Sequence, residues 1–458
     1  MKDAIVNFVE SKRAKANTPI RVGFVGFGKT NAAIYAALNG RCRCDFTLRQ
    51  EGDNPICAPD GIKVIRGDAA LCDIYEDILF LSPSVRRERI SYSCTAILSS
   101  DTDIFFSKKR NTFAVTGSDG KSTVTTLSSL LLSESFPDAF IGGNIGTPVA
   151  LARLQSTSAF VLELSSFNLS YVIPYSHRAI VTNLSPNHLN WHASFEEYSE
   201  SKRRALIFTD EPIINADTEA AEKTAEGIPL FAVCSTLHDS DTLVKRYRPE
   251  HVLTLEGERI MLDGESVLRV SELRRRERHN VANMMSAIAM SIGYADRELV
   301  CRVAGEFCGL EHRCEHFHER DGITFINSSI DTSPERTRAT LSSLGKRVTL
   351  ILGGRGKGLE LTPLISPLAD YAERIAIYGE IKDELADFIK SHKELSAIPR
   401  ESFIRFDEAL EYATRYLTSG DTLLLSPSAT AYGEFVSFEE RGAHFKKYIL
   451  QKYNKTKN

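Results

Sequence analysis

The stretch from Asn111 to Thr126 constrains this chain most, because a strand pattern, a glycine turn and a helix pattern follow one another without a break. Glycines in such a turn let backbone N–H groups approach phosphate oxygens, and the start of the helix adds a favourable partial charge. Lys121 is expected to contact the outer phosphates, and the Ser122 hydroxyl to ligate Mg²⁺, although Val115 stands where the full motif has a glycine. The sequence therefore predicts a nucleotide phosphate site formed by Gly117, Ser118, Asp119, Gly120, Lys121, Ser122 and Thr123.

Composition excludes several classes of function. The chain has 458 residues, which suggests about three domains, and a net charge of −4 argues against a large basic surface for nucleic acid or membrane. The start of the chain lacks a signal-peptide pattern, and no apolar run approaches the ~18 residues of a membrane span. Nine cysteines show no paired spacing typical of a zinc site. We expect a cytoplasmic protein that neither inserts into membranes nor binds nucleic acid.

Apolar runs of strand length alternate with helical patterns along the chain, which predicts an α/β protein with largely parallel sheets. Residues 1–108 are expected to form a Rossmann-like domain, and residues 109–309 a central domain of the P-loop ATPase type. Short alternating strands within 219–277 predict a small antiparallel patch at the edge of the central sheet. Residues 310–458 are expected to form a second Rossmann-like domain.

The first domain contains part of a dinucleotide fingerprint. Gly23, Gly26 and Gly28 follow the spacing, but Asn31 holds the place of the last glycine. Because any strand-to-helix turn favours glycine, this pattern fits a phosphate site and a plain turn equally well.

Polar residues of the central domain collect at the predicted carboxyl ends of parallel strands, where ligands of such sheets bind. Lys121, Ser122, Glu163 and His188 all fall at or just past such ends. A carboxylate inside an apolar strand costs several kcal/mol unless it is paired, so Glu163 is either in a buried salt bridge or a Mg²⁺ ligand. His188 is either a hydrogen-bonded loop histidine or a group that contacts metal or phosphate.

Three further segments are less informative by themselves. Lys202 lies in a helical stretch that opens with a capping pattern at Ser194 and Glu197, and composition alone makes it a surface lysine. The glycine-rich loop 353–358 turns a corner or cradles an anion, and Lys357 favours the anion. The polar tail from Lys446 to Asn458 is expected to fray.

Taken together, ordered blocks across all three predicted domains resemble the Mur ligases of bacterial cell-wall synthesis, and among them the branch that adds glutamate to a muramoyl nucleotide sugar. The blocks that carry the resemblance are Val115–Ser122, Gly142–Gly146, Leu162–Phe167, Tyr198–Lys202, His279–Asn283, Leu310–Arg313, Gly353–Lys357 and Ser437–Gly442.

The resemblance implies an ATP-dependent ligase that forms an acyl phosphate, with a nucleotide sugar and a free amino acid as its other substrates. By the family pattern, Ser122, Glu163, His188 and Lys202 support two Mg²⁺ ions, Lys202 being carbamylated. Asn283 would contact adenine and Arg313 the terminal phosphate. The nucleotide sugar would meet Asn144, together with Gly28, Thr30, Arg49 and Ser82 of the first domain. Thr332, Lys357, Thr430 and Phe438 would surround the amino acid. We expect a monomer.

The chain departs from the family pattern at several positions. Ser328-Ser329-Ile330 replaces the usual Asp-Ser-Lys, Ala431 replaces a serine, and Asn187 replaces an aspartate. Asp331 is a candidate substitute for the missing carboxylate. These changes leave open the identity and handedness of the amino acid. The alternatives are a sibling ligase for L-glutamate or another amino acid, a folylpolyglutamate synthase-like ligase, and a catalytically inactive regulator that binds a nucleotide sugar.

Overall fold

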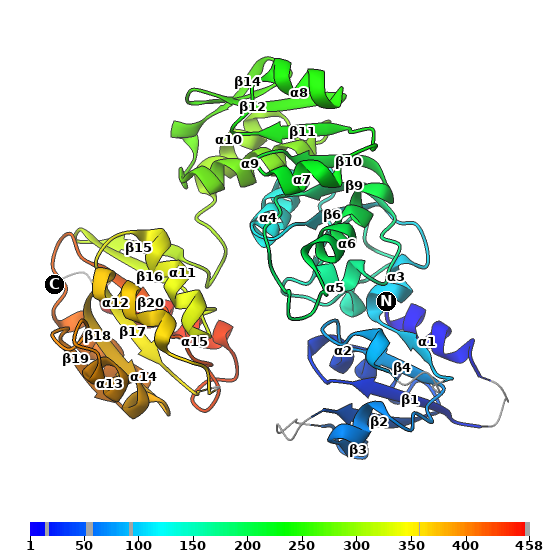
Figure 1. Ribbon diagram of the computed structural model, residues 1–458, viewed down its shortest axis with the longest axis horizontal. Helices are drawn as coiled ribbons and strands as arrows, with labels where there is room; N and C mark the ends of the chain where they lie inside the picture. The colour runs from blue at the N-terminus through cyan, green and yellow to red at the C-terminus, as the bar shows by residue number, and fades with distance from the viewer. Residues whose placement is uncertain (14–17, 52–57, 91–94, 357, 454–458) are drawn as a thin grey trace. The chain divides into compact units, whose positions relative to one another are not determined.

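The computed structural model describes residues 1–13, 18–51, 58–90, 95–356 and 358–453. The chain divides into two compact units, Met1–Phe307 and Cys308–Asn458 (Figure 1). The first unit contains two sheets and the second unit one, and helices alternate with the strands of all three. The α/β fold class is therefore confirmed. Within the described ranges, no helix is both long enough and apolar enough to span a bilayer.

The first sheet is fully parallel and is built around β1, which pairs with β2 on one side and β4 on the other. Phe24 in β1 stacks between Phe46 and Phe80 and anchors the core of this domain. The amino-terminal helix α1 was not predicted, yet it buries Ile5 and Val9. The strand order is β3-β2-β1-β4-β5, with bounds β1 Ile20–Val25, β2 Cys44–Gln50, β3 Lys63–Arg66, β4 Ile78–Leu81 and β5 Ile97–Ser99, and the helices are α1 Lys2–Glu10, α2 Lys29–Leu38 and α3 Asp101–Phe106.

The second sheet has nine strands in the order β14-β13-β12-β11-β10-β9-β6-β8-β7. It is parallel from β7 to β12, and β13 and β14 are antiparallel, as the short strands of 219–277 predicted. The strands are β6 Thr112–Thr116, β7 Phe140–Gly143, β8 Phe160–Glu163, β9 Ser176–Val181, β10 Thr209–Asn215, β11 Ala232–Ser235, β12 His251–Glu256, β13 Arg259–Leu262 and β14 Glu265–Arg269. The helices are α4 Lys121–Leu131, α5 Ser166–Leu169, α6 Phe195–Ile207, α7 Glu219–Thr224, α8 Ser240–Tyr247, α9 Arg278–Ser291 and α10 Arg297–Glu306.

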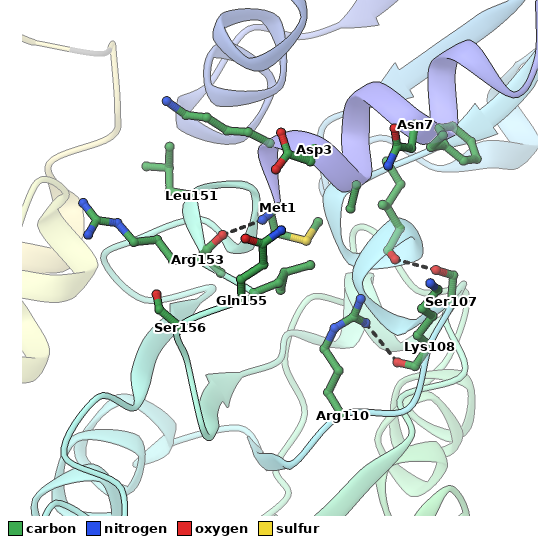
Figure 2. A pocket seen from close by; sticks show the side chains of 16 residues that line it. Met1, Asp3, Asn7, Ser107, Lys108, Arg110, Leu151, Arg153, Gln155 and Ser156 are labelled. Carbon is green, nitrogen blue, oxygen red and sulfur yellow. Dashed lines mark hydrogen bonds between the residues drawn. The ribbon is translucent and has the colours of Figure 1, made fainter.

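A groove of about 920 Å³ lies between α1, α3 and the segment 151–156 (Figure 2). The amino group of Met1 donates to the Ala152 carbonyl at 2.6 Å, and Arg110 donates to the Lys108 carbonyl at 3.0 Å. Arg110 lies two residues before β6, so the groove lies at the amino end of that strand, opposite the glycine turn. Among the predicted site residues that the structure describes, none lines this groove.

The sheet of the second unit has the order β15-β16-β20-β17-β18-β19 and is parallel except for β15. Its strands are β15 Glu315–Arg320, β16 Ile323–Asn327, β17 Val348–Gly353, β18 Ala372–Tyr378, β19 Arg400–Phe403 and β20 Thr422–Leu425. Its helices are α11 Pro334–Leu344, α12 Ile365–Tyr371, α13 Lys382–Ser391, α14 Phe406–Arg415 and α15 Phe438–Tyr453. The prediction that the chain frays from Lys446 is wrong as far as Tyr453, because α15 buries Phe445 and Ile449; residues 454–458 lie outside the described ranges.

Candidate active site

The glycine turn between β6 and α4 requires its glycines for two separate reasons. Gly117 and Gly120 have φ values of +148° and +76°, which side chains with a Cβ rarely adopt. A Cβ on Gly117 would also lie 2.0 Å from the Thr182 hydroxyl, and one on Gly120 would lie 2.2 Å from Oδ1 of Asn283. Lys121 is the first residue of α4. The turn therefore presents backbone N–H groups and the helix start at the carboxyl edge of the sheet, as a phosphate site requires.

Glu163 ends β8 beside the glycine turn, because β6 and β8 pair with Val115 opposite Glu163. Its side chain is only 2% exposed. One carboxylate oxygen accepts a hydrogen bond from the Ser122 hydroxyl at 2.6 Å, and the other accepts one from the Asn144 amide at 2.7 Å. Both donors are neutral, so they satisfy the hydrogen-bonding capacity of the carboxylate without balancing its charge. A buried carboxylate held in this way suits a divalent cation.

Lys202 is buried, so the prediction of a surface lysine is wrong. It lies on α6 with 1% of its surface exposed, and its amine donates to the Thr116 hydroxyl at 3.2 Å. The amine also lies 4.8 Å from the centre of the Tyr198 ring. Burial, aided by the positive charge of Lys121, lowers the pKa of Lys202 well below its usual value. The neutral amine is therefore favoured far more than on a surface lysine.

His188 follows β9, the other neighbour of β6, and is held in a tight turn. Its backbone has a φ of +54°, and its carbonyl accepts hydrogen bonds from the N–H groups of Trp191 and His192, each at 2.9 Å. The ring packs edge-on against Phe167, with 4.9 Å between ring centres. Desolvation and the positive charges of Lys121 and Lys202 lower the pKa of His188. The imidazole is therefore neutral near pH 7, which is the form that binds metal.

A pocket of about 640 Å³ opens beside the glycine turn, at the carboxyl ends of β9, β10 and β11. Asn283 of α9 lines it together with His279 and Gly120. Asn183, which the sequence analysis did not single out, holds the turn in place: its side chain accepts from the Asp119 N–H at 2.8 Å and donates to the Asp119 carbonyl at 3.0 Å. The volume suits a nucleoside next to the phosphate turn.

We expect Gly120→Ala to weaken nucleotide binding about tenfold or more, because the new Cβ must displace Asn283 while the backbone keeps a positive φ. Gly227→Ala is the matched control, since Gly227 has a φ of +74° and open space around its Cβ. Titration with a fluorescent ATP analogue measures the effect. Equal affinities of the two variants for the analogue would contradict this expectation, because the Cβ at position 120 would then not disturb the pocket.

Of the residues of the first domain predicted to bind the nucleotide sugar, three lie at the ends of helices or strands and one, Arg49, is buried. Thr30 is in the first turn of α2, Gly28 precedes that helix, and Ser82 directly follows β4. Asn31, in place of the last fingerprint glycine, donates to the Gly26 carbonyl at 2.8 Å and ties the turn to the sheet. Arg49 is 1% exposed: it pairs with Glu76 at 2.8 Å and donates to the carbonyls of Ala70, Cys72 and Asp73.

In the second unit, loops after the parallel strands β16, β17 and β20 converge on one buried cation, Arg441 of α15. Its guanidinium donates to the Ser329 hydroxyl at 2.9 Å and to the Ala429 carbonyl at 3.1 Å. The Ser329 hydroxyl in turn donates to the carbonyl of Phe438 at 2.8 Å. The Thr430 hydroxyl donates to the Arg355 carbonyl at 2.9 Å, which joins the β20 loop to the glycine loop. Arg441 was not among the predicted site residues.

The other predicted residues of the second unit that the structure describes differ in burial. Arg313 is exposed, Thr332 is half-buried in the loop after β16, and Lys357 lies outside the described residues. Asp331 is 4% exposed and accepts hydrogen bonds from the hydroxyls of Ser426 at 2.7 Å and Thr340 at 2.8 Å. Its carboxylate is engaged inside the domain, and burial raises its pKa.

A glycine phosphate turn flanked by a buried carboxylate and a buried lysine defines the first unit as a nucleotide-binding α/β domain of an enzyme. Comparison with known proteins narrows the class. Residues 115–291 match the family described as the Mur ligase middle domain, and residues 312–429 match the Mur ligase glutamate ligase domain.

Full-length relatives agree with the domain matches. The UDP-N-acetylmuramoylalanine–D-glutamate ligase of Acetivibrio thermocellus is 32% identical over 398 residues, which cover 81% of this chain and 82% of that protein. The enzyme of the same name from Ruminiclostridium cellulolyticum is 31% identical over 391 residues, with 81% and 82% covered. The chain belongs to the Mur ligase family of ATP-dependent amide-bond ligases, which act in peptidoglycan synthesis.

Solved structures share the fold. The UDP-N-acetylmuramate–alanine ligase of Thermotoga maritima aligns with a TM-score of 0.55 at 18% identity, covering 94% of this chain and all of that one. The UDP-N-acetylmuramoylalanyl-D-glutamyl-2,6-diaminopimelate–D-alanyl-D-alanyl ligase of Acinetobacter baumannii aligns with a TM-score of 0.52 at 15% identity, covering 98% of each chain.

Proposed function

We propose that this chain adds D-glutamate to UDP-N-acetylmuramoyl-L-alanine, with cleavage of ATP, in the cytoplasm. The observation that carries the proposal is the junction of β6, β8 and α6, which brings Glu163 against Ser122 and a buried Lys202 against Thr116. The relatives named UDP-N-acetylmuramoylalanine–D-glutamate ligase support the choice of substrates. In this proposal residues 1–108 bind the nucleotide sugar, 109–309 bind ATP and 310–458 bind the amino acid.

The reaction requires activation, because a carboxylate and an amine do not condense in water. The substrate carboxylate attacks the γ-phosphorus of ATP and releases ADP, and the resulting acyl phosphate is attacked at its carbonyl carbon by the amine of the amino acid. The amine loses a proton and inorganic phosphate leaves, so that one amide bond forms for each ATP cleaved. Lys121 stabilises charge on the phosphoryl group during transfer, and the backbone N–H groups of the glycine turn hold its oxygens.

The residues present fit magnesium. Glu163 offers a buried carboxylate whose hydrogen-bond donors are neutral, Ser122 offers a hydroxyl at its side, and His188 offers a neutral imidazole. Bound there, Mg²⁺ would neutralise phosphate charge during transfer. Ser122 and Glu163 would hold one ion, and His188 would support a second.

Carbamylation of Lys202 fits the state of its amine. Only a neutral amine attacks CO₂, and the lowered pKa of Lys202 favours that form. The carbamate would place an anion beside Thr116 and within the same site as Lys121. We propose that this anion, rather than an ammonium, is the working form.

The decisive experiment measures phosphate release by the purified chain with ATP, Mg²⁺, UDP-N-acetylmuramoyl-L-alanine and a panel of D- and L-amino acids. We expect release with D-glutamate to exceed that with L-glutamate by more than about a hundredfold, since a stereocentre decides whether the amine reaches the acyl carbon. Preference for L-glutamate or another amino acid would identify a sibling ligase. Binding of the nucleotide sugar without phosphate release for any amino acid would identify a regulator.

A further inference from the structure

The loop that follows β4, residues Ser82–Arg89, contacts the central domain at two points within the first unit. The backbone N–H of Arg87 donates to the Tyr171 hydroxyl at 3.0 Å, just after α5, in the segment that follows Glu163. The carbonyl of Ser84 accepts from the indole N–H of Trp191 at 2.8 Å, in the segment that carries His188. The loop that contains Ser82 is therefore joined to both segments that bear the proposed metal ligands.

Arg86 makes most of the contacts between this loop and the segment around Trp191. One of its guanidinium nitrogens donates to the Trp191 carbonyl at 2.6 Å, and another donates to the Glu197 carboxylate at 3.3 Å. The guanidinium also lies 5.1 Å from the centre of the Trp191 ring. The planar, multiply donating group of arginine suits these three contacts, which lysine cannot reproduce together.

Trp191 links Arg86 to the turn that contains His188. The N–H of Trp191 donates to the His188 carbonyl, which closes the turn at the residue with φ +54°. Phe167 packs between the two side chains, with ring centres 4.7 Å from Trp191 and 4.9 Å from His188. Glu197 fixes the other end of the turn, because its second carboxylate oxygen accepts the N–H of Ala193 at 2.7 Å. A shift of Arg86 must therefore move the turn that aims His188.

We infer that Arg86 is a positioning residue that couples occupation of the nucleotide-sugar site at the β4 loop to the placement of His188, through Trp191. The inference rests on the proposed function, which gives Ser82 and His188 their roles. The site that holds the sugar nucleotide and the site that holds the second metal ion are then thermodynamically linked, so each ligand tightens the binding of the other by the same factor.

Trp191 is the only tryptophan of the chain, so its fluorescence reports directly on this contact. Mn²⁺ bound near His188 would quench it, which allows Mn²⁺ to be titrated with and without UDP-N-acetylmuramoyl-L-alanine. We expect the nucleotide sugar to tighten Mn²⁺ binding about fivefold or more in the parent, and this factor to fall towards one in Arg86→Ala. In turnover, Arg86→Ala should lower kcat more than it raises KM for the nucleotide sugar.

Arg89→Ala is the matched control, because Arg89 belongs to the same loop but forms an exposed pair with Glu51 at 2.5 Å. It should retain the coupling. Equal coupling in the parent and Arg86→Ala, or equal loss in both variants, would overturn the inference. His188→Ala tests the underlying assignment separately: unchanged Mn²⁺ affinity in that variant would refute the metal role of His188, whatever Arg86→Ala does.

Discussion

Lys121→Ala is expected to reduce phosphate release by at least about a thousandfold, because transfer of a phosphoryl group depends on preorganised positive charge. The amine of Lys121 lies against the carbonyls of Gly117 and Ser118, at 3.0 and 2.7 Å, over the turn that is to hold the phosphates. Lys121→Ala should lower the affinity for ATP less than it lowers the rate of phosphate release, since the charge on the phosphoryl oxygens matters most at the transition state. Rates are measured by phosphate release, and affinity by titration with a fluorescent ATP analogue.

Lys109→Ala is the control for Lys121→Ala. Lys109 is exposed, pairs with Asp210 at 2.8 Å and lies just before the amino end of β6, so its removal changes the net charge equally without reaching the turn. It should keep parental turnover. A Lys121→Ala enzyme within tenfold of the parent would mean that the turn does not hold the transferred phosphoryl group.

The convergence of the central site followed from the sequence, because the carboxyl ends of neighbouring parallel strands must meet. Val115 lies opposite Glu163 in the pairing of β6 with β8, and Thr116 lies opposite Val181 in the pairing with β9. Once these stretches are recognised as strands, proximity of Lys121, Ser122 and Glu163 requires no knowledge of distant contacts. The antiparallel edge β12–β14 was predictable for a different local reason, since short turns join its strands.

Burial of Lys202 could have been recognised from helix periodicity. Tyr198, Lys202, Ala205 and Leu206 lie on one face of α6 at i, i+4, i+7 and i+8, and all four are buried. Residue type alone predicts a surface lysine, but Lys202 lies on an otherwise buried stripe of the helix. Among the predictions made from the sequence, only the resemblance to the family gave Lys202 a functional role.

Contacts between distant segments could not be predicted. Arg49 was expected to contact a ligand at the end of β2, but in the structure it pairs with Glu76, which lies beyond β3. No local pattern in the sequence predicts that pair. The contact of Arg86 with Trp191 joins residues 105 positions apart. Glu197 shows the limit of a local rule: Ser194 does cap α6, but the Glu197 carboxylate accepts from Ala193 instead of closing the expected capping box.

Lys202→Ala is expected to lose at least about a hundredfold in turnover, because the site then lacks a charge placed among preorganised groups. If the working form is the carbamate, acetate or formate should restore part of the activity in a saturable manner, by returning an anion to the space beside Thr116. Methylamine should not restore it. The opposite result, rescue by methylamine and none by acetate, would show that Lys202 works as an ammonium.

Two further measurements separate this chemical role from a structural one. Lys121→Ala should not respond to acetate, since it lacks a cation, so rescue specific to Lys202→Ala excludes a general salt effect. Lys202→Met should be inactive yet no less stable than the parent to urea, because burying an amine is costly and an apolar side chain of similar length removes that cost. Lys202 is buried, that burial lowers the pKa of its amine, and the amine contacts Thr116 at the end of β6. Loss of turnover without loss of stability in Lys202→Met would therefore favour a chemical step that needs the neutral amine.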